Sequence, residues 1–175
     1  MLFNDARVRV CLLLVAITFL TGCGLGAEGD NGEVTVIESF SVQGSADAVS
    51  GVVPINAGIN GGKFSVSWKV TASDPYFARL FLSEDAKLIE QDDISVFAES
   101  CATQNVLNSC FDTVSLQCVF TADNKVSCGP RSILAEAPDV TTFLDQIPKS
   151  ANLILHVCNA VLENCKDSAV QIELQ

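Results

Sequence analysis

The residues of this chain best able to do chemistry are its eight cysteines and a run of acidic residues. Six of the cysteines lie between residues 101 and 165, and neighbours along the chain can be paired with 8, 9 and 6 residues between them. Zinc sites usually take cysteines about two to four residues apart, so these spacings disfavour zinc. An even set instead predicts three disulfides in an oxidising compartment. The six residues are Cys101, Cys110, Cys118, Cys128, Cys158 and Cys165.

The acidic run places five carboxylates within ten residues, with Lys87 as the single basic residue among them. They are Glu84, Asp85, Glu90, Asp92 and Asp93. Calcium takes about six to eight oxygen ligands, and the loop could supply several of them, although it is not an EF-hand. The simpler interpretation is a solvated acidic face. We therefore predict no cofactor and keep Ca²⁺ held by Glu84, Asp85, Asp92 and Asp93 as the alternative.

His156 is the only histidine of the chain. In the hairpin register given below it lies opposite Asp167. Such a pair could orient a general base only beside a nucleophile and an oxyanion site. The sequence contains no Gly-x-Ser-x-Gly, His-Glu-x-x-His or phosphate-binding loop. We therefore predict a cross-strand ion pair on the surface and a protein that is not an enzyme.

The N-terminal residues carry the pattern of an export signal. Arg7 and Arg9 precede an apolar run over residues 10–20, and the small residues Thr21 and Gly22 follow it. The run is too short for a membrane-spanning helix, which needs about 20 apolar residues. The pattern predicts a cleaved signal peptide over residues 1–22.

The end of this signal, Leu20-Thr21-Gly22-Cys23, resembles the lipobox of bacterial lipoproteins. The resemblance implies that the Cys23 thiol carries diacylglycerol and palmitate-type chains, which anchor the mature protein firmly in a membrane. An ordinary secretory signal with a cysteine at its cleavage site is the alternative. Gly24 stands where an Asp commonly retains lipoproteins in the inner membrane. Since this position is Gly24 and not Asp, the sequence favours the outer membrane, at the periplasmic face or the surface.

The composition of the remaining chain limits its partners. Without residues 1–22, it keeps 153 residues, with 8 basic and 20 acidic side chains. This strong negative charge repels phosphate backbones, so we predict no nucleic-acid partner. A chain of this length forms one domain with its own core. Residues 24–32 are rich in glycine, which predicts a flexible tether over residues 23–33 and a folded domain over residues 34–175.

The elements that must position these residues are predicted to be strands. Apolar and polar residues alternate strictly from Phe64 to Ala72, which predicts a strand with one buried face and Trp68 as a core anchor. Short strands without any helical period predict an all-β fold, an antiparallel immunoglobulin-like sandwich stapled by disulfides. Further strands are predicted at residues 34–42, 76–82, 94–98, 116–121, 125–128, 140–144, 153–158 and 169–174.

Two hairpins would bring cysteines into register. A three-residue loop 122–124, with Asn124 in a left-handed conformation, would set Cys118 opposite Cys128. Setting Cys158 opposite Cys165 also places Leu155 opposite Ser168 and the apolar residues of both strands on one face. Elimination would then leave Cys101 for Cys110, although the sequence alone permits other connectivities.

A segment beginning at Leu80 is similar to the strand-and-loop motif of bacterial cell-adhesion-related (CARDB-like) immunoglobulin-like domains. Its strand ends in Ser83-x-Asp85, and Asp92 follows. The closing hairpin, with Ile147-Pro148 ahead of it and Glu163 in its loop, also resembles the last two strands of that family. The resemblance implies an immunoglobulin-like sandwich.

These observations predict a non-catalytic lipoprotein of the bacterial cell envelope. It would be anchored to the membrane through Cys23 and act as a structural or binding module for an unknown protein or glycan. The alternative is a Ca²⁺-dependent envelope or adhesion protein that binds the ion through the acidic loop 84–93.

Replacing Cys23 with Ser should release the protein from membranes without unfolding it, because the acyl chains would lose their attachment site. Fractionation of cells followed by detection of the protein in the soluble and membrane fractions measures this. A Cys23→Ser variant that stays in the membrane pellet would contradict the assignment of the anchor.

Overall fold

The computed structural model of this protein describes residues 35–48, 50–89, 91–101, 110, 114–129, 134 and 136–175. The predicted signal peptide 1–22, the lipidation site Cys23 and the tether to residue 33 lie outside these residues. Glu33–Gln175 forms one compact unit. Among the described residues, no helix is long and apolar enough to cross a membrane.

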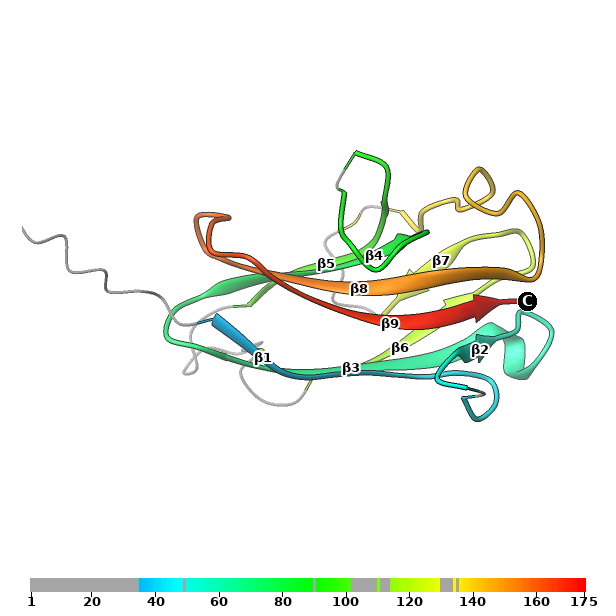
Figure 1. Cartoon of the computed structure of the whole chain (residues 1–175), viewed down its shortest axis with the longest axis horizontal. Coiled ribbons are helices and arrows are strands. Elements are labelled where there is room, and N and C mark those ends of the chain that lie inside the picture. Colours follow the sequence, from blue (N-terminus) through cyan, green and yellow to red (C-terminus); the bar gives the residue numbers. More distant parts are fainter. Residues whose placement is uncertain are drawn as a thin grey trace, which may run out of the picture. The chain divides into compact units, whose positions relative to one another are not determined.

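Nine strands and one short 3-10 turn make up the described part of the chain, which confirms the all-β prediction (Figure 1). The strands are β1 (Thr35–Gln43), β2 (Val53–Ile55), β3 (Lys63–Ala72), β4 (Tyr76–Ser83), β5 (Ile94–Cys101), β6 (Val114–Phe120), β7 (Val126–Cys128), β8 (Lys149–Asn159) and β9 (Lys166–Leu174), and the turn η1 is Asn60–Gly62.

The strands form two sheets, one with the order β1-β3-β6-β7 and the other with the order β2-β9-β8-β4-β5. Figure 1 shows β8 and β9 in one layer and β1 and β3 in the other. All pairs are antiparallel except β2 with β9, which run parallel. The antiparallel prediction is therefore wrong for this pair, and β2 was not predicted. Pro54 has no N–H to donate, and its place in an edge strand requires none.

The core lies between the two inner faces. On β3 the predicted alternation is confirmed, because Phe64, Val66, Trp68 and Val70 are all buried. Trp68 is fully buried and its ring meets that of Phe97 edge to face, with centroids 5.9 Å apart. Such a pair adds about 0.5–1.5 kcal/mol beyond the burial of its area. Trp68 is therefore the core anchor that its strand predicted.

The outer face of the five-stranded sheet is also apolar near its centre. Phe81 on β4 and Ile154 on β8 lie opposite each other, and only 3% and 0% of their surfaces are exposed. Ala98 and Cys158 are buried as well but stand apart from the main core. A strand buried on both faces reads as a nearly continuous apolar run. This explains why β4 and β8 alternate less clearly than β3.

All three predicted disulfides are present. Cys118–Cys128 joins β6 to β7, and Cys158–Cys165 closes the β8–β9 hairpin, each with its Cα atoms 4.0 Å apart. Cys101–Cys110 is the third bond. The hairpin registers are as predicted, with Cys118 opposite Cys128 and Leu155 opposite Ser168. Asn124 has a φ of 57°, the left-handed conformation that the loop requires.

The predicted strand at residues 140–144 is wrong. This segment is a turn in which the N–H groups of Phe143 and Leu144 both donate to the carbonyl of Val140. All three side chains are buried. Their spacing of three and four residues fits one face of a helical turn and does not fit the period of two expected for a strand.

Gly62 should tolerate alanine far less than its neighbour Gly61. Both have a positive φ, 71° and 65°, which costs an alanine about 1–2 kcal/mol. A Cβ on Gly62 would also lie 1.7 Å from the carbonyl oxygen of Phe120, whereas one on Gly61 meets nothing within 4 Å. We expect Gly62→Ala to lower the free energy of unfolding in urea by a further ~1–3 kcal/mol. Equal losses for both variants would contradict the close approach of η1 to β6.

Candidate functional site

The predicted acidic residues lie in the β4–β5 loop, where it meets the segment between β7 and β8. A cavity of about 360 Å³ opens there. Its lining consists of Ser83, Glu84, Asp85, Ile89, Asp92, Asp93, Ile94, Thr142 and Phe143. The four acids named as the candidate Ca²⁺ ligands therefore line one cavity, while Glu90 lies outside the described residues. We call this feature the acidic cavity.

Two of these carboxylates hold the backbone of their own loop. Asp85 Oδ1 accepts a hydrogen bond from the Lys87 N–H at 2.7 Å, and Asp93 Oδ2 accepts one from the Ile89 N–H at 2.7 Å. Asp and Asn side chains commonly stabilise turns in this way. The acidic loop is therefore ordered by the same groups that make it acidic.

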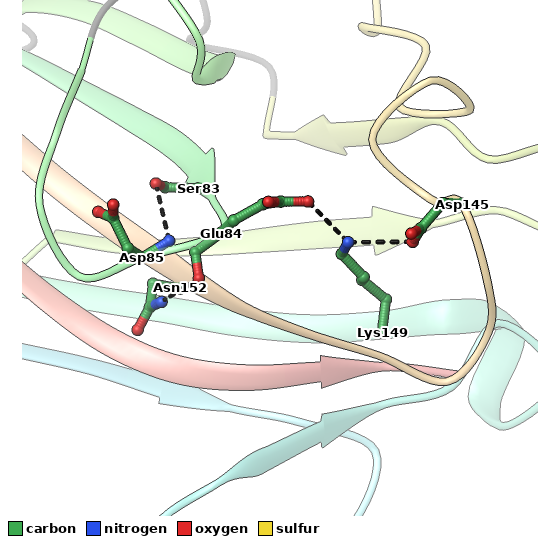
Figure 2. A network of polar contacts seen from close by, with 6 residues as sticks. All are labelled: Ser83, Glu84, Asp85, Asp145, Lys149 and Asn152. Atoms are coloured by element: carbon green, nitrogen blue, oxygen red, sulfur yellow. Dashed lines mark hydrogen bonds and ion pairs between the residues drawn. The ribbon is translucent and has the colours of Figure 1, made fainter.

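Lys149, at the start of β8, connects this loop to the segment that precedes β8 (Figure 2). Its Nζ lies 2.7 Å from Glu84 Oε1 and 3.0 Å from Asp145 Oδ1. The Nζ also lies 5.5 Å from the ring centre of Phe143, which lines the cavity. Asn152 Nδ2 donates to the Glu84 carbonyl at 3.3 Å. Glu84 is thus held at both its side chain and its backbone. Lys149 was not predicted from the sequence, because its partner Glu84 is 65 residues away.

These contacts shift two pKa values in opposite directions. The hydrogen bonds that Lys149 donates, first to Glu84 and then to Asp145, raise the pKa of Lys149, and the bond that Asp145 accepts from Lys149 lowers the pKa of Asp145. The two carboxylate side chains remain largely exposed to water, so the ion pairs are screened and add little to stability. Their main effect is to orient Glu84 beside the cavity.

The acidic cavity does not form a compact metal centre as it stands. Among the described residues, two groups of three potential ligands have all their donor atoms within 4.8 Å of one another. They are His156 with Cys158 and Cys165, and Glu99 with Cys101 and Cys110. Both contain cysteines of a disulfide, whose sulfurs are not thiolates. Glu84, Asp85, Asp92 and Asp93 belong to neither group. Ca²⁺ binding by these four acids would therefore require their side chains to move closer together.

His156 lies opposite Asp167, as its register predicted, and its Nδ1 is 2.5 Å from Asp167 Oδ1. The prediction that this pair is a surface feature is wrong for the histidine, which is only 8% exposed. The reason is the apolar outer face of the sheet, where the Phe81 ring meets the imidazole with centroids 6.0 Å apart. The other ring nitrogen, Nε2, lies 2.9 Å from the Sγ of Cys158.

This contact between His156 and Cys158 was not predicted. Residues i and i+2 of a strand lie on the same face, so the pattern His-x-Cys on β8 was a signal for it. The hairpin register that predicted Asp167 opposite His156 places the carboxylate on the other side of the imidazole. No family model matches this chain, and the comparison with curated proteins gives no match either.

Lys149→Met should weaken the pH dependence of stability at both ends. The lowered pKa of Asp145 stabilises the fold above its ordinary value of about 4, and this contribution disappears as pH falls through the lowered pKa. The raised pKa of Lys149 stabilises below its ordinary value of about 10.4 and is lost as pH rises through the raised one. The free energy of unfolding in urea, measured from acid to alkaline pH, should therefore change less with pH in the variant than in the wild type.

Part of the loss of stability at acid pH should remain in Lys149→Met, since other exposed carboxylates also have lowered pKa values. Lys69 is the main cause for Glu38, Thr121 for Asp123 and Thr141 for Asp139. Lys63→Met removes one positive charge from the exposed start of β3 and serves as the control. Identical profiles for the two variants would show that the contacts of Lys149 do not contribute.

Proposed function

We propose that this protein is a non-catalytic lipoprotein of a bacterial cell envelope. It is anchored through acyl chains on Cys23, and its domain is presented by the glycine-rich tether over residues 23–33. The lipobox-like segment that ends in Cys23 supports the anchor, and Gly24 supports the outer membrane. Three disulfides in one domain agree with an oxidising compartment such as a periplasm or cell surface.

We further propose that the domain is immunoglobulin-like and related to the CARDB-like domains. In an immunoglobulin sandwich, strands A, B and E are neighbours in one sheet, and strands C, F and G in the other. The orders β1-β3-β6 and β4-β8-β9 agree with these positions. One feature departs from the scheme, because strand D precedes E along an immunoglobulin chain whereas β7 follows β6.

The observation that carries a binding function is the acidic cavity. Four carboxylates line it, and Lys149 and Asn152 hold Glu84 at its rim. The chain as a whole is also acidic, with a net charge of −11, so a partner with basic groups would be attracted to the protein and held by these carboxylates. We propose a protein or glycan with a positively charged surface as the ligand. Exposed loops on a rigid sandwich are a common place for such a site.

Ca²⁺ binding is the second candidate. It is favoured by one observation, that Glu84, Asp85, Asp92 and Asp93 border the same cavity. The ion would attract the carboxylates toward one another and order the loop further. In this case Ca²⁺ would raise the melting temperature of the protein and EDTA would lower it, because a ligand that binds only the folded state stabilises it.

The test is affinity capture from detergent-solubilised membranes, with the wild type compared with a variant in which Glu84, Asp85, Asp92 and Asp93 become Gln or Asn. We expect envelope partners to be retained by the wild type and lost from the variant, because the attracting charges are gone. Asp47→Asn with Asp74→Asn, two acids remote from the cavity in the sequence, is the control. Parallel captures and melting curves in Ca²⁺ and in EDTA distinguish the two candidates, and equal capture by all variants would refute a role for the cavity.

A further inference from the structure

We propose that the Cys158–Cys165 disulfide is a redox-active site for thiols, in which His156 gives a proton to the departing sulfur of Cys158. The three parts lie together at the end of β8 and the start of β9. His156 Nε2 is 2.9 Å from Cys158 Sγ, and Nδ1 is 2.5 Å from Asp167 Oδ1. With a proton on Nε2 the imidazole can donate to Cys158 Sγ, while Nδ1 faces the Asp167 carboxylate, which fixes the orientation of the ring.

The two sulfurs of this bond are placed differently. Cys158 is 3% exposed and lies against the histidine, whereas Cys165 is partly exposed at the hairpin. Attack in thiol–disulfide exchange falls on the accessible sulfur, and the other sulfur departs. The sulfur that departs is therefore the one that His156 contacts. The exchange therefore has one preferred order, with attack at Cys165 and departure of Cys158.

The exchange takes place in two steps. The thiolate of an external thiol, such as a small thiol or a reduced dithiol protein, attacks Cys165 Sγ and forms a mixed disulfide. The bond to Cys158 breaks, its electron pair moves to Cys158 Sγ, and the proton of His156 Nε2 converts that sulfur to a thiol. A second external thiolate then attacks the external sulfur of the mixed disulfide and releases Cys165. Two external thiols are oxidised to one disulfide, and His156 regains a proton from water.

The other two disulfides lack this arrangement. The chain has a single histidine, so neither of them has an imidazole beside it. Both cysteines of Cys118–Cys128 are buried, with 0% and 2% exposed, and those of Cys101–Cys110 are buried as well. Cys118–Cys128 is a matched internal reference, because it also joins facing strands at a Cα separation of 4.0 Å.

The experiment follows the reduction of each bond in the detergent-solubilised full chain by reduced glutathione. Samples are quenched with acid, free thiols are alkylated, and peptides are identified by mass spectrometry. We expect Cys158–Cys165 to open first, with glutathione trapped on Cys165 and absent from Cys158. His156→Gln should slow this opening about tenfold, since the rate depends on how well the leaving sulfur carries its charge. Asp167→Asn should slow it to a smaller extent.

Glu163→Gln removes a charge from the same hairpin without touching the imidazole, and its rate should equal that of the wild type. The opening of Cys118–Cys128 should be the same in all variants, which reports that they are folded. If His156→Gln does not fold, Asp167→Asn provides the same test. The proposal is overturned if the variants open at the wild-type rate, if glutathione is trapped equally on both cysteines, or if Cys158–Cys165 stays closed while the other bonds open.

Discussion

The register of β8 between β4 and β9 is the constraint on which most of this structure depends. In this register Leu153, Leu155 and Val157 face the core, while Ile154 and His156 face outward. A slip by one residue would exchange the two faces and move Cys158 away from Cys165. The disulfide and the hydrophobic core therefore select the same pairing, and each stabilises the other.

The same strand connects the two sites of interest. Lys149 at its start holds Glu84 beside the acidic cavity, and His156 and Cys158 lie near its other end. Ser83 of the cavity pairs with Asn152, four residues before His156, so at about 3.3 Å per residue the two sites are roughly 13 Å apart along β8. We propose a charged partner for the acidic cavity and thiol exchange for the β8–β9 hairpin.

The burial of the outer face near Phe81 and Ile154 changes the chemistry available to His156. An exposed histidine opposite an aspartate would form a weak, screened ion pair. Here the imidazole meets the Phe81 ring edge to face and lies between a carboxylate and a sulfur. The contacts fix the orientation of the ring, so each nitrogen has a defined partner. His156 therefore connects Asp167 to Cys158 through polar contacts on both of its ring nitrogens.

The sequence by itself determined what depends on local pattern. The alternation from Phe64 to Ala72, both hairpin registers and the three disulfides could be predicted, because strand periodicity and turn residues act over a few positions. Only the tertiary structure decided the parallel pairing of β2 with β9, the contact of Lys149 with Glu84 and the burial of His156. These features join segments as much as 119 residues apart, and nothing in the sequence around one segment specifies its distant partner.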